Sequence, residues 1–309
     1  MTLLIIAPDR DLSPWESALQ VCAPELEVQI WPQTASTTEV TFALCWRQPA
    51  DIWQQLPNLR CISSLGAGVD HLLQDPELPT DIPIVRLIDP LLAQSMFEYI
   101  CAAAMGILRD FDIYLAQQSA ACWRPQNLTV SQHYTVGIMG LGQLGAYTAE
   151  RLAQIGFNVV GWSRSQKQLA GVETYAGNAQ LPEFLRRANI LVCLLPLTEQ
   201  TRDILNRDFF EQLPRQAYLI NVARGEHLVE ADLLTAIDTG QIRGACLDVF
   251  RQEPLPPDHP FWRHPQIRVT PHCSSITNPA SVAPQIVENY RRSQAGQPLL
   301  NQVSRSRGY

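Results

Sequence analysis

The chain has 309 residues, of which 46% are hydrophobic, and its formal net charge is −7. This length is enough for two domains with cores of their own, whereas the acidic balance argues against a nucleic-acid or anionic-membrane partner, which would require a basic face. No apolar run approaches the roughly 18 residues of a transmembrane helix, and Met1–Ala7, which lacks a basic flank, is predicted to be a first strand rather than a signal peptide.

Residues 1–90 are predicted to alternate short strands and helices. Buried strands are expected at Leu3–Ala7, Thr41–Trp46 and Arg60–Leu65. A helix is expected at Pro14–Cys22, with Ser13 as its N-cap. A long helix without proline follows from Gln94 to about Gln118, because its apolar residues recur at helical spacing. Such a helix could bridge two domains.

A second series of strands and helices begins at Tyr134. Tyr134–Met139 is predicted to be a strand, and the helix after it runs from Gln143 to about Ile155 and ends at Gly156. Later strands are expected at Phe157–Trp162, Ile190–Leu195, Ala217–Val222, Arg243–Val249 and Ile267–Thr270. Helices separate these strands, and a final helix begins at about Pro279. This alternation is typical of parallel, doubly wound α/β sheets, which is the fold class that we expect.

The eight cysteines are scattered and include no Cys-x-x-Cys pair. Several lie within apolar runs, as Cys193 does, and this pattern indicates reduced core residues of a cytosolic protein. Cys273 follows His272 and is interpreted as a residue that lines a pocket rather than as a nucleophile.

The segment Gly140-Leu141-Gly142-Gln143-Leu144-Gly145 follows a predicted strand and opens a predicted helix. In that context Gly-x-Gly-x-x-Gly is the signature of a dinucleotide-binding turn. Gly140 permits the tight turn, Gly142 lets a pyrophosphate approach the backbone, and Gly145 lets the helix pack closely on the strand. The N-terminus of the helix, which begins with Gln143 and Leu144, then faces the anion.

The end of the next strand indicates which dinucleotide is bound. Chains that bind NAD normally have Asp or Glu there, about twenty residues beyond the turn, to accept a hydrogen bond from the ribose 2′-hydroxyl. This chain has Ser163-Arg164-Ser165-Gln166-Lys167 instead. Hydroxyls at Ser163 and Ser165 and cations at Arg164 and Lys167 suit a 2′-phosphate, so we predict NADPH in preference to NADH.

Three later segments supply an arginine, a carboxylate and a histidine at the ends of predicted strands: Arg224 in Asn221–Gly225, Glu253 in Asp248–Pro254 and His272 in Thr270–His272. These groups match the needs of carbonyl reduction. Arg224 can hold a substrate carboxylate and polarise the carbonyl, and His272 can donate the proton. Glu253 can stabilise and orient the imidazolium. His227, close to Arg224, is a candidate supporting residue, and no metal enters this scheme.

Taken together and in this order, the motifs resemble those of the D-2-hydroxyacid dehydrogenases along nearly the whole chain. The resemblance rests on Leu65–Asp70, Gly140–Gly145, Leu195–Thr198, Asn221–Gly225, Leu247–Pro254 and Thr270–His272. Within that family the chain is most similar to the glyoxylate/hydroxypyruvate reductase A branch, in Trp46, Met96–Tyr99, Trp162–Arg164, Arg251–Pro257 and Arg307–Tyr309.

The resemblance implies a flavodoxin-like substrate domain made of residues 1–98 and 279–309, with a Rossmann coenzyme domain, residues 99–278, inserted into it and the active site in the cleft between them. It implies that the coenzyme also contacts Leu195, Pro196, Val222, Ala223, Arg224 and Asp248. The substrate carboxylate would bind the backbone N–H groups of Ala67 and Gly68 as well as Arg224. His272 would contact the substrate as its proton donor, and Trp46 would narrow the substrate pocket. Trp123 and the long helix would form a homodimer interface.

The sequence thus favours a cytoplasmic, NADPH-dependent reductase of a small 2-ketoacid, glyoxylate or hydroxypyruvate. Two alternatives remain open. One is a reductase of bulkier 2-ketoacids or a dehydrogenase of the phosphoglycerate type. The other is a regulatory protein that senses the dinucleotide without turnover.

Overall fold

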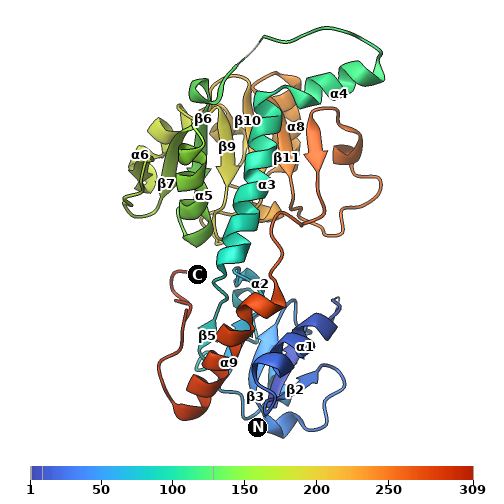
Figure 1. Ribbon diagram of the computed structural model, residues 1–309, viewed down its shortest axis with the longest axis vertical. Helices are drawn as coiled ribbons and strands as arrows, with labels where there is room; N and C mark the ends of the chain where they lie inside the picture. Colours follow the sequence, from blue (N-terminus) through green and yellow to red (C-terminus); the bar gives the residue numbers. More distant parts are fainter. Residues whose placement is uncertain (1, 9, 128, 309) are drawn as a thin grey trace. The chain divides into compact units, whose positions relative to one another are not determined.

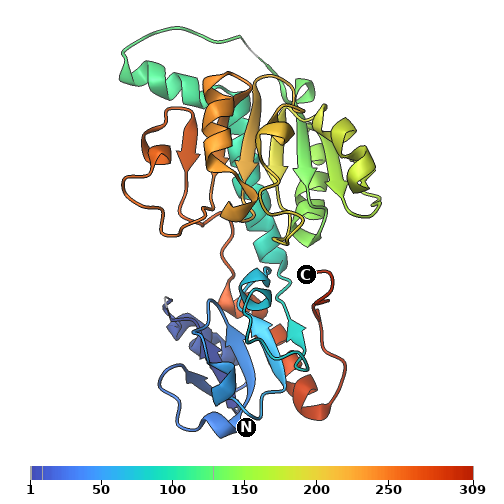
Figure 2. The same ribbon diagram turned by 180° about the vertical axis from the view of Figure 1, so that it is seen from behind.

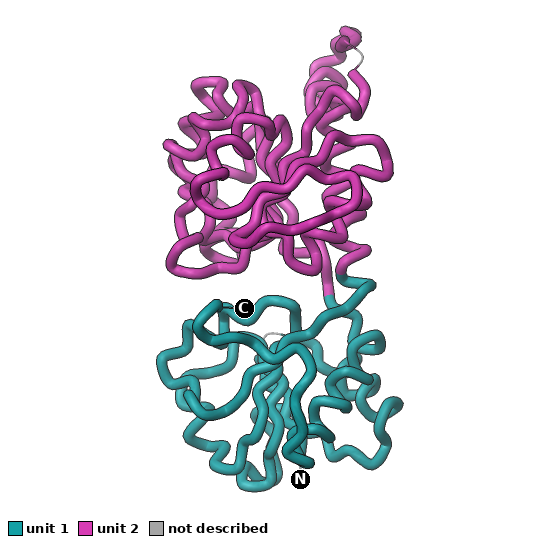
Figure 3. The backbone as a smooth tube through the Cα atoms, turned by 90° about the vertical axis from the view of Figure 1, so that its left-hand side faces the viewer, with its two compact units in different colours: residues 1–92, 277–309 teal, residues 93–276 magenta. Residues whose placement is uncertain are grey.

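The computed structural model describes residues 2–8, 10–127 and 129–308 (Figure 1). Two compact units divide the chain: unit 1 is Met1–Leu92 with Thr277–Tyr309, and unit 2 is Ala93–Ile276 (Figure 3). The sequence predicts the two boundaries between the units slightly later along the chain, after residues 98 and 278. Met1 of the predicted first strand and Tyr309 of the closing motif lie outside the described residues.

Unit 1 is built on a parallel sheet whose order in the described residues is β2-β1-β3-β4-β5. Its strands are β1 (Thr2–Ile6), β2 (Glu27–Ile30), β3 (Val40–Cys45), β4 (Cys61–Ser64) and β5 (Ile84–Val85). The apolar side chains of β1, β3, β4 and β5 are buried, as a parallel sheet covered on both faces requires, whereas those of the edge strand β2 are half-buried. This strand order is that of flavodoxin-like folds, so the expected class is confirmed for unit 1.

Helices cover both faces of the sheet of unit 1. On one face, α1 (Ser13–Cys22) and α9 (Pro279–Ala295) pack through residues such as Leu19 and Ile286. The other face packs against the loop segments that contain the 3₁₀ helix η2 (Trp53–Gln55) and the short α2 (Asp70–Leu73). A further 3₁₀ turn, η1, spans Thr37–Glu39. The sequence predicts Ser13 as the N-cap of α1, but Ser13 is already helical, and Asp11 accepts a hydrogen bond from its N–H at 3.0 Å.

Unit 2 is built on a second parallel sheet, ordered β12-β11-β10-β9-β6-β7-β8 in the described residues. Its strands are β6 (Thr135–Met139), β7 (Asn158–Ser163), β8 (Glu173–Ala176), β9 (Ile190–Cys193), β10 (Ala217–Asn221), β11 (Ile242–Leu247) and β12 (Ile267–Val269). The order reverses between β6 and β9, which is the Rossmann arrangement with one more strand at the far edge. Ligands of such sheets bind at the carboxyl ends of the strands beside this reversal.

The sheet of unit 2 is doubly wound, with helices on both faces (Figures 1 and 2). On one face lie α3 (Pro90–Leu108) and α5 (Gln143–Gln154), and on the other α6 (Gly177–Leu185), α7 (Arg207–Phe210) and α8 (Glu230–Asp238). The remaining elements are α4 (Phe111–Ser119) and the 3₁₀ turns η3 (Ser131–His133), η4 (Gly225–His227) and η5 (Pro260–Arg263).

The long helix predicted from Gln94 to Gln118 is wrong as a single element. The chain leaves the helix after Leu108, Asp110 adopts a left-handed backbone with φ 55°, and α4 begins at Phe111. Arg243 stabilises this break, because its guanidinium contacts Asp110 at 2.6 Å and Asp112 at 3.1 Å. The local spacing of apolar residues could not reveal an ion pair with a residue on the distant β11.

The sequence analysis predicts that no segment is long and apolar enough to span a membrane. By length and composition, α3 contradicts that prediction. The helix has 19 residues and a mean hydropathy of 1.5, enough to cross a bilayer by those two criteria. Half of its most apolar window is buried, and Met96, Ile100 and Ile107 pack in the core of unit 2. The apolar character of α3 is therefore accounted for by the packing of a core helix.

The cysteines are all free thiols, as predicted, but they are not all core residues. Cys45, Cys61, Cys193 and Cys246 are buried, Cys22 and Cys101 are half-buried, and Cys122 and Cys273 are exposed. Burial raises the pKa of Cys193 to about 12. Such thiols are inert structural residues, whereas Cys122 and Cys273 are open to solvent.

Candidate active site

The predicted site segments of unit 2 follow neighbouring strands and lie along one edge of its sheet. The register aligns Met139 of β6 with Trp162 of β7 and with Cys193 of β9, and it aligns Asn221 of β10 with Cys193 and with Leu247 of β11. In parallel strands these alignments place the carboxyl ends together. From one side to the other the segments are Ser163–Lys167, Gly140–Gly145, Leu195–Pro196, Asn221–Gly225, Asp248–Glu253 and Thr270–His272.

The glycine turn has the shape that a dinucleotide requires. Gly140 has φ 100°, in the region that favours glycine, and a Cβ on Gly145 would lie 1.8 Å from the carbonyl oxygen of Gly140. A Cβ on Gly142 would meet nothing within 4 Å, so the backbone there is open to a ligand. Because Gly142 precedes the first residue of α5, the N–H groups of that helix N-terminus point at this opening. The chain therefore fits a pyrophosphate at the predicted position.

The segment predicted to select the coenzyme begins where β7 ends, at Ser163. Arg164, Ser165 and Lys167 are exposed at the edge beside the glycine turn, and the Ser163 hydroxyl donates to the carbonyl of Ser165 at 2.8 Å. The strand carries no carboxylate at this point, so the surroundings are cationic and rich in hydroxyl groups. A ribose 2′-phosphate would be attracted there rather than repelled.

Arg224 is placed by a turn that its neighbours hold from both sides. The buried Asn221 accepts from the N–H of Ala223 at 3.2 Å and donates to the carbonyl of Arg224 at 3.0 Å. The guanidinium of Arg224, half-buried, donates to the carbonyl of Ala223 at 2.7 Å. Asn221 is thus a residue whose supporting role the sequence did not reveal, although it opens the Asn221–Gly225 motif.

Gly225 brings the Arg224 turn against the segment that carries Glu253. A Cβ at position 225 would lie 1.9 Å from the backbone carbon of Phe250, a distance at which no side chain fits. Arg251 joins the two segments further, because its Nε donates to the carbonyl of Leu228 at 2.8 Å and its guanidinium pairs with Asp203. The arginine and the carboxylate of the predicted set therefore stand on backbone segments in direct contact.

His272 and Glu253 form the pair that the sequence predicts. Nδ1 of His272 lies 2.9 Å from Oε2 of Glu253, whose other oxygen accepts from the N–H of Phe250 at 3.1 Å. The side chain of His272 is 31% exposed and that of Glu253 is 16% exposed, so the imidazole reaches solvent while the carboxylate is mostly covered. With Nδ1 donating to Glu253, Nε2 is left for a substrate.

Asp248 organises the turn that presents His272. It is fully buried, and its carboxylate accepts from the hydroxyl of Thr270 at 2.6 Å and from the N–H groups of Cys273 and Ser274, both at 2.9 Å. The N–H of His272, whose φ is 51°, donates to the carbonyl of Asp248 at 2.9 Å. Asp248 therefore fixes the backbone on both sides of the histidine. Its predicted contact with the coenzyme stays a prediction.

A chain of hydrogen bonds reaches Asp248 from helix α3. The hydroxyl of Tyr99 lies 2.6 Å from that of Thr270. Because the single hydrogen of Thr270 goes to the Asp248 carboxylate, Tyr99 must be the donor in this pair. The thiol of Cys246, 3.3 Å from the Tyr99 oxygen, can then donate to it. Burial raises the pKa of Tyr99, which keeps this donor protonated. The sequence pointed to Tyr99 as part of a motif but not to its role.

Cys273 has the properties of a spectator thiol. It is exposed next to His272, yet partial burial and, after it, the neighbouring Asp248 carboxylate raise the pKa of the thiol. A raised pKa lowers the thiolate fraction on which nucleophilic attack depends. This supports the interpretation of Cys273 as a lining residue.

The substrate-binding residues predicted in unit 1 come together at the carboxyl edge of its own sheet. Trp46 follows β3, and Ala67 and Gly68 follow β4, the strand paired with it. The ring of Trp46 is fixed on two sides: the Arg10 guanidinium lies 4.4 Å from its centroid, and the His71 ring lies 4.6 Å away. These contacts hold Trp46 in one orientation. Its predicted contact with substrate stays a prediction.

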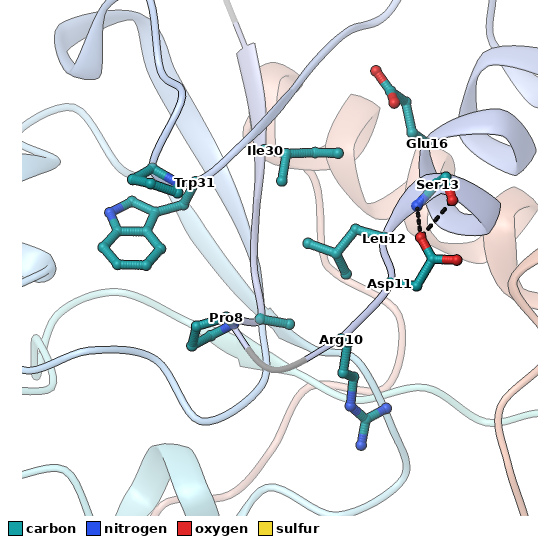
Figure 4. A pocket seen from close by; sticks show the side chains of 10 residues that line it. Pro8, Arg10, Asp11, Leu12, Ser13, Glu16, Ile30 and Trp31 are labelled. Atoms are coloured by element: carbon teal, nitrogen blue, oxygen red, sulfur yellow. Dashed lines mark hydrogen bonds between the residues drawn. The ribbon is translucent and has the colours of Figure 1, made fainter.

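A pocket of about 330 Å³ in unit 1 is a separate feature. In Figure 4, Trp31 and Ile30 lie on one side of it, and Arg10 and Leu12 lie on the segment that leads to α1. Asp11 points away toward Ser13, to which it is hydrogen-bonded. Among the described residues, the lining of this pocket includes none of the residues predicted to bind substrate or coenzyme.

Comparison with known proteins agrees with this geometry. The family model for the NAD-binding domain of D-isomer specific 2-hydroxyacid dehydrogenases matches residues 101–274. Glyoxylate/hydroxypyruvate reductase A of Yersinia enterocolitica is 39% identical and that of Salmonella newport is 40% identical, each over 314 residues that cover 100% of both chains.

Solved structures are similar over the same length. A D-isomer specific 2-hydroxyacid dehydrogenase from Xanthobacter autotrophicus Py2, in complex with NADPH and MES, superposes with a TM-score of 0.96 at 41% identity and covers 100% of this chain and 99% of its own. The NADPH-dependent glyoxylate/hydroxypyruvate reductase of Sinorhizobium meliloti, in complex with NADP and sulfate, gives a TM-score of 0.92 at 37% identity, with 100% of both chains covered.

Proposed function

Because the chain belongs to the D-isomer specific 2-hydroxyacid dehydrogenases, we propose that it reduces small 2-ketoacids with NADPH, glyoxylate to glycolate and hydroxypyruvate to D-glycerate. The observation that carries this proposal is the His272–Glu253 pair, 2.9 Å apart, on a turn braced by the buried Asp248. The names of the full-length relatives, and the NADPH and NADP in their structures, support the substrate and the coenzyme.

In the proposed mechanism each residue has one task. Arg224 binds the substrate carboxylate and polarises the carbonyl oxygen with its fork of donors. His272 donates its Nε2 proton to the forming alkoxide, and Glu253 stabilises the imidazolium before that transfer. The coenzyme, when bound, supplies the hydride to the keto carbon. Gly140, Gly142 and Gly145 with their neighbours would hold its pyrophosphate, and Leu195, Pro196, Val222 and Ala223 would line its nicotinamide half.

The coenzyme preference rests on Ser163, Arg164, Ser165 and Lys167, where the strand end offers cations and hydroxyls and no carboxylate. For the substrate, we propose that the N–H groups of Ala67 and Gly68 bind its carboxylate and that Trp46 limits its size. The packing of Arg10 and His71 on Trp46 supports the proposed limit on substrate size, because an indole held in one orientation occupies a fixed part of the pocket. The eight free thiols favour a reducing compartment, and we propose the cytoplasm.

The function is tested by initial rates of NADPH and NADH oxidation with glyoxylate, hydroxypyruvate, pyruvate, phenylpyruvate and 3-phosphohydroxypyruvate. We expect the highest kcat/KM with NADPH and the first two substrates. Faster turnover with NADH would contradict the assignment of Arg164, and preference for phenylpyruvate or the phosphorylated acid would favour the reductases of larger substrates. Absence of turnover with all five would favour a regulatory protein.

We propose further that the chain forms a homodimer through α4 and the segment after it. Helix α4 extends away from the sheet of unit 2 (Figures 1 and 2). Among the described residues of α4 and of the segment after it, large apolar side chains are exposed at Phe111, Tyr114, Leu115, Trp123 and Val130. Trp123 is 99% exposed. Exposed large apolar side chains are typical of protein interfaces, where aromatic residues are enriched.

The dimer is tested by light scattering coupled to size-exclusion chromatography. We expect the wild type to elute with the mass of two chains and Leu115→Asp to elute as one chain, because a buried charge disrupts an apolar interface. Val21→Asp is the matched control, since Val21 is 84% exposed on α1 of unit 1, and it should leave the mass unchanged. A wild type with the mass of one chain would refute the dimer.

A further inference from the structure

His227 has a buried ring between the Arg224 turn and the loop that follows β9. It is the last residue of η4, and it is fully buried. Its Nδ1 lies 3.2 Å from the backbone nitrogen of Arg224, and its Nε2 lies 3.3 Å from the carbonyl oxygen of Pro196. One side chain thus connects the residue assigned to the substrate with the loop assigned to the coenzyme.

The partners of the ring determine where its hydrogen lies. A carbonyl oxygen can only accept, so the contact with Pro196 requires the hydrogen on Nε2. In the neutral ring Nδ1 is then an acceptor, and it faces the N–H of Arg224. Nδ1 also lies 3.1 Å from the carbonyl of Arg224, but a second hydrogen there would place a charge on a fully buried ring, which is costly. The neutral tautomer with hydrogen on Nδ1 would keep only this one contact, whereas the neutral tautomer with hydrogen on Nε2 makes the contacts with both the Arg224 N–H and the Pro196 carbonyl.

The consequence is that both backbone groups of Arg224 are fixed by side chains. His227 holds its N–H, and Asn221 holds its carbonyl at 3.0 Å. His227 itself is anchored by its own carbonyl, which accepts from the N–H of Leu205 at 2.9 Å. The Pro196 carbonyl has a second donor in Thr201, at 2.7 Å. Loss of the His227 ring would therefore leave the Arg224 N–H without this acceptor, whereas Pro196 would keep a donor.

We propose that His227 is a positioning residue for the reaction, which acts through Nδ1 by fixing the backbone from which the Arg224 guanidinium reaches the substrate carboxylate. The inference rests on the proposed function, because it assigns His227 a role through Arg224. It goes beyond that function in naming the atom that matters and in predicting that the two ring nitrogens contribute unequally.

Two substitutions separate the ring nitrogens. In His227→Asn the side-chain oxygen replaces Nδ1, so the acceptor for Arg224 is kept and the donor to Pro196 is lost. In His227→Gln the side-chain nitrogen replaces Nε2, so the donor is kept and the acceptor is lost. Both variants are to be assayed as the full chain for kcat, for KM with glyoxylate, for Kd of NADPH and for thermal midpoint.

We expect His227→Gln to raise KM for glyoxylate about tenfold, since loss of the acceptor for a part-buried N–H is costly, and His227→Asn to raise it no more than about twofold. The Kd of NADPH and the thermal midpoint should be similar in the two variants. If His227 had a purely structural role, both quantities would change together with KM. His259→Gln is the matched control: its ring is also bonded through both nitrogens, to Phe261 and Glu230, and its KM should equal that of the wild type.

Equal KM values for the Asn and Gln variants, or a higher KM for Asn, would overturn the inference. If the Gln variant does not fold, nitrogen NMR of the wild type decides, with the His227 ring assigned by its absence from the Asn variant. A ring with hydrogen on Nε2 and bare Nδ1 supports the inference, and a hydrogen on Nδ1 refutes it. The proposed function fails separately, by lack of wild-type turnover with every 2-ketoacid.

Discussion

Replacing His272 by glutamine is expected to lower kcat for glyoxylate about 10²- to 10⁴-fold, the contribution typical of a general acid. The reason is that glutamine cannot release a proton near neutral pH, whereas imidazole can. The geometry supports the assignment, because Glu253 contacts Nδ1 at 2.9 Å and the side chain of His272 is 31% exposed. The measurement is kcat and KM at saturating NADPH, with the Kd of NADPH expected to stay near that of the wild type.

Two variants accompany this experiment. Glu253→Gln keeps a hydrogen-bonding group beside the ring but removes the charge, so its kcat should fall between those of the wild type and His272→Gln. Cys273→Ser changes the exposed thiol next to the histidine and should keep kcat within about twofold of the wild type, as surface substitutions usually do. A loss in Cys273→Ser as large as that in His272→Gln would assign the chemistry to the thiol instead.

Replacing Arg224 by lysine is expected to lower kcat/KM about 10²- to 10³-fold, similar to the loss of an oxyanion-stabilising donor. Lysine keeps the positive charge but lacks the planar fork that binds a carboxylate and a carbonyl oxygen together. Arg224→Ala should be at least as severe, because it removes the charge as well. The loss should appear in both kcat and KM, since Arg224 is assigned to substrate binding and to polarisation of the carbonyl.

Arg215→Lys is the matched control for this substitution. Arg215 precedes β10 at the end of the strand opposite to Asn221, so it lies at the edge away from the proposed site. Its kinetic constants should equal those of the wild type. Near-normal turnover of Arg224→Ala would contradict the assignment of Arg224 and the mechanism built on it.

The positions of the proposed catalytic residues and of the proposed coenzyme turn can be predicted from the sequence because their signals are local. A parallel strand buried on both faces is a continuous apolar run, and the residue types that follow it are read directly from the chain. The ends of β6, β10 and β12 were recognised in this way, and the turn after each of them carries Gly140, Arg224 or His272. Parallel strand order then brings these turns to one edge, so their proximity required no further information.

His227 is a candidate from the sequence because it lies close to Arg224, but other supporting residues are not predictable, because their partners are far away in the sequence. Tyr99 meets Thr270 across 171 residues, and Asp110, at the break between α3 and α4, meets Arg243 across 133. Periodicity and turn signals extend over a few residues, so they cannot predict a contact between residues that are so far apart in the sequence. The sequence therefore predicts one continuous helix across this break, and it places Tyr99 in a motif without indicating its hydrogen-bond partner.

The sequence by itself thus determined the two α/β units, the family, and the order in which Arg224, Glu253 and His272 follow their strands. The tertiary structure alone decided how those residues are braced: Asp248 under the His272 turn, and His227 between Arg224 and Pro196. The physical reason is that a buried polar group must find its partner wherever the fold places one. Which partner that is depends on the packing of the sheet and its helices, and no local pattern in the chain specifies it.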